Sequence, residues 1–192
     1  CMSSETGAAL QDTFWLPGDF GAAMLNVGDV LGGPTDDLLV LWPFGGLAFL
    51  YPGDLVGGSG VMTPQLIQLP SSAAGEMVLL ADLDGSGTRD VAIGDPAANA
   101  VHVIDPMSGN LLFTITDPRV GNFGAALASD GGIRLAVGAP TWSNTVPPGI
   151  TTGYVNLYKL NGGGAAQAAT FSPTPLTTSR EFGRSLANVG DL

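Results

Sequence analysis

The amino-acid sequence predicts an all-β protein made of short antiparallel strands, and composition is the first reason. Hydrophobic residues make up 45% of the 192 residues, which is enough for a domain with a buried core. Charged residues are only 12%, whereas about 25% is usual, and there are 29 Gly and 14 Pro. Amphipathic helices need charged residues on their exposed faces, so this composition favours strands and tight turns.

Internal repetition is the second reason. Runs rich in leucine or β-branched residues end at Pro43, Pro96 and Pro140, a period of roughly 50 residues. A Phe-Gly pair occurs at 20–21 and 123–124, ahead of the first and third runs, and again at 182–183. The middle unit begins instead with GEMVLLADLD. Two further apolar segments follow each run, so each unit is expected to hold about four strands separated by Gly, Pro, Asp or Asn turns.

Four-stranded units of this length predict the blades of a β-propeller. We divide the chain into a linker (1–11), three units (12–70, 71–118 and 119–178) and the start of a fourth (179–192). The segment TFWLPG resembles the outer strand of an earlier unit. About three blades and part of a fourth do not close a ring. The sequence is therefore expected to be a piece of a longer propeller, rather than an open arc with exposed edges.

The motifs DFGAAMLNVGD, EFGRSLANVGDL, DLDGSGTRDVAIGDP and RLAVGAP resemble the FG-GAP repeats of the integrin α-subunit N-terminal β-propeller and its bacterial relatives. Gly-Ala-Pro is intact at 138–140, reads Gly-Asp-Pro at 94–96 and has become Leu-Trp-Pro at 41–43. The resemblance implies a seven-bladed ring, an extracellular or cell-surface location, and calcium in loops between the first two strands of some blades. The repeated phenylalanines are expected to pack between blades: Phe20, Phe123 and Phe182.

The segment DLDGSGTRD, residues 82–90, is the candidate metal site. Calcium is a hard cation that takes six to eight oxygen ligands. Alternate positions of this loop supply such oxygens, and the two intervening glycines permit the positive φ angles that a tight loop requires. The predicted ligands are Asp82, Asp84, Ser86, the Thr88 carbonyl and Asp90.

Two alternatives to this calcium loop remain open at the sequence level. An EF-hand begins similarly but has Glu at its twelfth position, where this chain has Ile93 inside an expected strand. A metal-free turn held by Asp side chains is the other alternative. Ser86 replaces the usual carboxylate at the fifth position, and the lost charge is expected to weaken binding.

The corresponding loops of the other units are degraded. The first unit, DVLGGPTDD, keeps only Asp29 and Asp37, so it is expected to bind calcium very weakly or not at all. The third unit has only SDGGIR, which is too short to surround a cation, and the fourth shows only Asp191.

The remaining notable residues are expected to have structural rather than catalytic or zinc-binding roles. His102 alternates with valines in an expected strand, and with one histidine and one cysteine the chain offers no zinc cluster or Cys-His pair. We therefore predict that this chain is not an enzyme. Trp142 begins a long polar connection, which is either an ordinary surface loop or the place where a ligand binds.

Charge and hydropathy limit the partners. The net charge is −11 with six basic residues, so nucleic acid is not expected to bind. The apolar segment 38–51 is too short to span a bilayer and is interrupted by Pro43, which predicts a buried hairpin. Cys1 is either a lipid-modified N-terminus of a surface lipoprotein or simply the first residue of a fragment.

Two functions fit these observations. The first is a calcium-stabilised propeller module of a secreted or cell-surface protein, used for adhesion or for recognition of a protein or glycan ligand on the propeller face. The second is the non-catalytic propeller portion of an extracellular hydrolase whose catalytic domain lies outside this chain.

Overall fold

The computed structural model describes residues 18–53, 63–72, 75–143, 152–173 and 181–190. Within these residues the chain is all-β, with twelve antiparallel strands in three four-stranded sheets. A short 3-10 turn, η1 (Pro43–Gly45), joins two strands of the first sheet. No helix in the described part of the chain is long and apolar enough to cross a bilayer.

Each sheet is a meander in which strands adjacent in sequence are adjacent in space. The first sheet contains β1 (Ala23–Gly28), β2 (Asp37–Trp42), β3 (Leu47–Tyr51) and β4 (Gln65–Gln68). The second contains β5 (Met77–Leu79), β6 (Val91–Asp95), β7 (Ala100–Ile104) and β8 (Leu111–Thr116). The third contains β9 (Ala126–Ser129), β10 (Arg134–Ala139), β11 (Tyr154–Asn161) and β12 (Gly164–Phe171).

These elements confirm the predicted all-β class and the four-stranded units. The apolar segment 38–51 forms the predicted hairpin, in which β2 and β3 pair from Leu38–Tyr51 to Trp42–Leu47. The three sheets are separate and none of them closes into a barrel.

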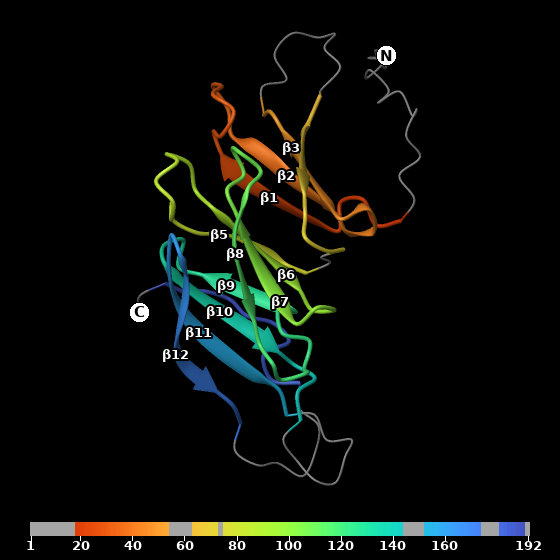
Figure 1. Cartoon of the computed structure of the whole chain (residues 1–192), viewed down its shortest axis with the longest axis vertical. Helices are drawn as coiled ribbons and strands as arrows, with labels where there is room; N and C mark the ends of the chain where they lie inside the picture. Colours follow the sequence, from red (N-terminus) through yellow and green to blue (C-terminus); the bar gives the residue numbers. More distant parts are fainter. Residues whose placement is uncertain (1–17, 54–62, 73–74, 144–151, 174–180, 191–192) are drawn as a thin grey trace, which may run out of the picture.

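The sheets are stacked along the long axis of the molecule, from β1–β4 through β5–β8 to β9–β12 (Figure 1). The first strands of successive sheets contact each other: β5 lies against β1 of the first sheet and β9 of the third. The central strands of the second sheet, β6 and β7, are buried on both faces. Ile93 and Ile104 join a core with the first sheet, whereas Val101 and Val103 join a core with the third.

Paired glycines bring neighbouring units together. A Cβ atom on Gly94 would lie 2.0 Å from the carbonyl oxygen of Gly124, and one on Gly138 would lie 1.9 Å from that of Gly183. The glycine of each Gly-x-Pro motif thus packs against the Phe-Gly glycine of the following unit. In the first unit Leu41 replaces this glycine, whereas the second unit keeps Gly75 at the position of Gly124 but has no Phe before it.

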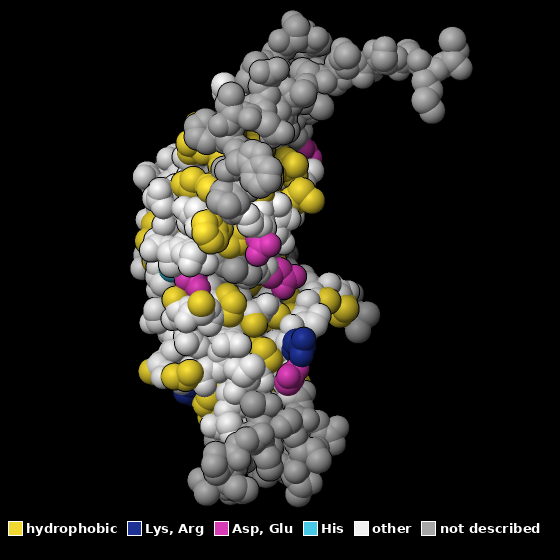
Figure 2. Space-filling model, turned by 90° about the vertical axis from the view of Figure 1, so that its right-hand side faces the viewer, with side chains coloured by type: hydrophobic (Ala, Val, Ile, Leu, Met, Phe, Trp, Pro, Cys, Tyr) yellow, Lys and Arg dark blue, Asp and Glu magenta, His cyan; other side chains and the backbone are white. Residues whose placement is uncertain are grey.

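The predicted burial of the three phenylalanines is only partly correct. Phe123 lies in the core between the second and third sheets and is fully buried. Phe20 is 43% exposed and Phe182 is 40% exposed. These two residues lie at the two ends of the stack, where the described residues include no further sheet to cover them. Acidic and apolar side chains are interspersed on the face shown in Figure 2, with few basic ones.

Candidate metal centre

The candidate loop connects β5 to β6 at the centre of the stack. The strand pairing continues past β5, since the amide of Leu80 donates to the carbonyl of Asp90 at 2.8 Å. Gly85 and Gly87 have φ angles of +82° and +95°, as the sequence predicted for the tight part of the loop.

Asp82 organises the loop through its backbone. Its Oδ1 accepts hydrogen bonds from the amides of Gly85 at 2.7 Å and Ser86 at 3.1 Å, and its Oδ2 accepts one from Gly87 at 2.9 Å. These bonds, the one from Gly87 above all, hold the pKa of Asp82 below its ordinary value. Asp84 accepts a further bond from the Ser86 amide at 2.9 Å. Backbone hydrogen bonds to Asp82 and Asp84 thus close the loop.

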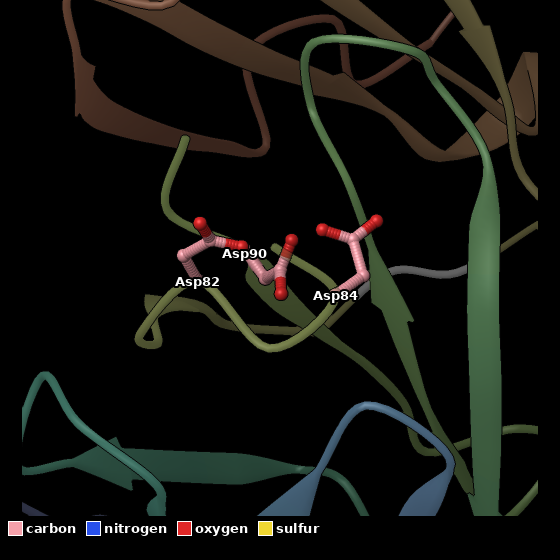
Figure 3. A group of neighbouring side chains, drawn as sticks. All are labelled: Asp82, Asp84 and Asp90. Carbon is pink, nitrogen blue, oxygen red and sulfur yellow. The ribbon is translucent and has the colours of Figure 1, made fainter. Parts of the chain in front are cut away.

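Asp90 differs from the other two carboxylates because it is fully buried. Its Oδ2 accepts a hydrogen bond from the Leu83 amide at 2.7 Å, whereas its buried Oδ1 has no hydrogen-bond partner. Carboxylate oxygens of Asp82, Asp84 and Asp90 lie within 4.8 Å of one another (Figure 3). A buried carboxylate oxygen without a donor is costly unless a cation or proton completes it.

Burial and the repulsion from neighbouring carboxylates both affect the pKa of Asp90. Burial raises the pKa of Asp90 to about 6, and the negative charges of Asp84, Asp105 and Asp82 add to the effect. A cation between the carboxylates would offset the cost of burial by supplying the missing partner, and it would neutralise the repulsion.

The two hydroxyl residues of the loop contact each other and a fourth carboxylate. The Oγ of Ser86 lies 3.2 Å from the Oγ1 of Thr88, which lies 3.2 Å from the Oδ1 of Asp105. Asp105 follows β7 and is buried. Burial alone would raise the pKa of Asp105, but hydrogen bonds from Ser108, Met107 and Thr88 lower it. The sequence interpretation missed Asp105, although an Asp-Pro turn directly after an apolar strand was a visible signal.

The degraded loop of the first unit has the same backbone frame. Asp29 accepts hydrogen bonds from the amides of Gly32 and Gly33, both at 2.8 Å. Asp37 occupies the position of Asp90, and its Oδ2 accepts from Val30 at 2.8 Å and Leu31 at 2.7 Å. Its Oδ1 accepts from the Gly53 amide at 2.9 Å. Both oxygens of Asp37 are therefore satisfied by the protein itself.

The strand register explains why Asp90 lacks this last bond. Leu38 pairs with Tyr51 in the first sheet, and Val91 pairs with Ile104 in the second. Two residues after Tyr51 stands Gly53, whereas two residues after Ile104 stands Pro106. Proline has no amide hydrogen, so the donor that completes Asp37 has no counterpart for Asp90.

The third unit has a tight turn in place of the loop. Asp130 Oδ1 accepts from the amides of Gly132 at 2.8 Å and Arg134 at 3.2 Å. This turn contacts the candidate loop, since Ala81 donates to the Gly132 carbonyl at 2.9 Å and the Arg89 guanidinium donates to the Gly131 carbonyl at 2.8 Å. The loop thus links the second sheet to the third. Asp191 lies outside the described residues.

His102 belongs to a second polar cluster beside the first sheet. Its Nδ1 lies 3.0 Å from the Thr114 hydroxyl and its Nε2 lies 3.2 Å from the Ser71 hydroxyl. Ser71 donates to Asp95, and Asp95 does not contact Nδ1 as it would in a hydrolytic triad. His102 is therefore a hydrogen-bonded strand histidine, as the sequence predicted.

Trp142 packs against the third sheet. Its ring meets Tyr154 edge to face at a centroid distance of 5.3 Å, and the Arg119 guanidinium lies 3.7 Å from the centre of the Tyr154 ring. Residues 144–151 of the adjoining polar connection lie outside the described residues, as does Cys1.

No protein-family model and no curated protein matches this chain. The candidate site is therefore defined by its geometry. The structure brings together the three predicted aspartates, places Ser86 and Thr88 in contact with each other, and adds Asp105.

Proposed function

We propose that this chain is a calcium-stabilised β-propeller module built from FG-GAP-like repeats. In this proposal it belongs to a secreted or cell-surface protein and serves adhesion or recognition of a protein or glycan ligand. The observation that carries the calcium site is the buried Oδ1 of Asp90, which has no donor and lies beside two further carboxylates.

The residues present fit calcium better than softer metals. The site offers carboxylates and hydroxyls but no imidazole or thiolate, and hard oxygen ligands suit calcium. Asp82, Asp84 and Asp90 would hold the ion, with neutral oxygens from Ser86 and Thr88. Bound calcium would supply positive charge and oxygen coordination, and the chain would gain a fixed connection between β5 and β6.

The propeller arrangement has separate support. The sheets are four-stranded meanders that meet through their first strands, β1, β5 and β9. The close glycine contacts repeat between the second and third units and again beyond the third, and this repetition supports an arrangement as successive blades.

Thermal unfolding tests the calcium site directly. The chain is expected to unfold at a higher temperature in millimolar calcium than in chelator, because the ion binds only the folded state. Asp90→Asn should abolish this difference. Asp29→Asn, in the first unit, is the matched control and should retain it. A parent chain whose unfolding temperature is the same with calcium and with chelator would refute the proposed site.

A further inference from the structure

We propose that Asp105, which lies outside the loop in sequence, is a positioning residue of the metal site. Through Thr88 it leaves a lone pair of the Ser86 hydroxyl, rather than its proton, available to the cation. This inference rests on the proposed calcium site and adds a residue and a role to it.

Asp105 accepts hydrogen bonds on both of its oxygens. Its Oδ2 accepts from the Ser108 amide at 3.1 Å and the Ser108 hydroxyl at 2.6 Å, and its Oδ1 accepts from the Met107 amide at 2.9 Å. An ionised carboxylate can only accept. The remaining contact, between Oδ1 and Thr88 Oγ1 at 3.2 Å, must therefore use the Thr88 proton.

This assignment determines which hydroxyl is the donor in the hydrogen bond between Thr88 and Ser86. A hydroxyl has one proton, and that of Thr88 is committed to Asp105. In the 3.2 Å contact between Thr88 and Ser86, the donor must then be Ser86. The Ser86 oxygen accepts the Thr88 amide at 3.4 Å and keeps a second lone pair for a cation.

The consequence is specific to this loop. Ser86 stands where a carboxylate would bind calcium without any need for orientation. A hydroxyl can turn either its proton or a lone pair towards the ion, and only the lone pair is attractive. Asp105 thus compensates in part for the missing charge at the fifth loop position, and the first unit, which has Pro52 at the equivalent strand position, has no such group.

Calorimetric titration of the full chain with calcium tests this relay. Thr88→Val keeps the shape of the side chain and removes its hydroxyl, so it should weaken binding about tenfold, as loss of an orienting group near a metal commonly does. Ser86→Ala should weaken binding similarly, and the double variant should be no weaker than either single one. Thr88→Ser restores the hydroxyl and should bind like the parent.

Measuring the effect of Thr88→Val in a Ser86→Asp background is the decisive test of the relay. A carboxylate ligand needs no orientation, so Thr88→Val should have no effect on calcium affinity once Ser86→Asp is present. The relay would be overturned if Thr88→Val weakened calcium binding equally in the parent and in the Ser86→Asp background. It would also be overturned if Thr88→Val had no effect on calcium affinity in the parent. Melting in chelator verifies that each variant folds. Absence of calcium binding by both the parent and Ser86→Asp would refute the metal site itself, which is a different result.

Discussion

The loops at 29–37 and 82–90 share a backbone frame and differ in how their last aspartate is completed. Asp37 is surrounded by three amide donors, whereas Asp90 has one donor and a buried oxygen with none. Both oxygens of Asp37 are thus satisfied within the protein, whereas Oδ1 of Asp90 could accept a cation. The comparison shows that the number of acidic residues is not the whole difference between the loops. The neighbouring turn matters as well, because the Gly53 amide donates to Asp37 whereas Pro106 has no amide hydrogen to donate to Asp90.

The largest contrast should come from the same substitution at the two equivalent positions. Asp37→Asn places an amide group against backbone donors, and the free energy of unfolding is expected to fall by about 2 kcal/mol because buried amides lose their acceptor. Asp90→Asn, measured in chelator at pH 7, should cost far less, since it removes an uncompensated buried charge. Urea unfolding at constant pH measures both. Equal costs would mean that the two aspartates are equally well satisfied.

The second contrast concerns pH. Because the pKa of Asp90 rises from 3.8 to about 6 on folding, its ionisation opposes folding. The free energy of unfolding of the metal-free protein should therefore fall as pH rises from 3.8 through about 6. The contribution of Asp37 to the free energy of unfolding has the opposite pH dependence. Burial would raise its pKa, but the amides of Gly53, Leu31 and Val30 lower it, so its contribution is lost as pH falls below 3.8.

Urea unfolding between pH 4 and pH 7 in chelator checks this prediction. Asp90→Asn should remove the decline that Asp90 causes, and Asp29→Asn should leave it in place. Saturating calcium should also remove or reverse the decline, because the ion binds the deprotonated carboxylate. A parent chain whose stability rises steadily across this range would contradict the raised pKa.

Much of the fold could be predicted from the sequence, because strands and turns are local features. Apolar runs ending at Pro43, Pro96 and Pro140 marked the second strand of each sheet, and glycine pairs marked the tight loop. The lack of a hydrogen-bond donor to Oδ1 of Asp90 could not be predicted in this way. It depends on the register of β6 against its neighbour β7, which brings Asp105 and Pro106 beside the loop. The exposure of Phe20 and Phe182 also depends on neighbouring sheets, which sequence periodicity does not describe.

A third test moves the missing donor into the second unit. Pro106→Ala supplies an amide at the position where Gly53 completes Asp37. If that amide reaches Asp90 Oδ1, the metal-free protein should gain about 1 kcal/mol of stability, and calcium affinity should fall about fivefold. Chelator melts and calcium titration measure the two effects. Pro52→Ala, in the turn after β3, is the matched control for loss of proline rigidity. A similar stability change in both variants would show that chain stiffness is responsible.

The smallest effect is expected from restoring acidic residues to the first loop. Leu31→Asp with Gly33→Asp recreates the third and fifth ligand positions on the exposed side of the loop. If ligand count alone governed binding, this double variant would bind a second calcium ion. We expect little or no second binding event, because Asp37 already has both oxygens engaged by amides and cannot turn towards an ion without breaking those bonds. A second ion bound by the double variant alone would mean that the amides around Asp37 yield easily to a cation. In that case the unpaired oxygen of Asp90 would not be what distinguishes the two loops.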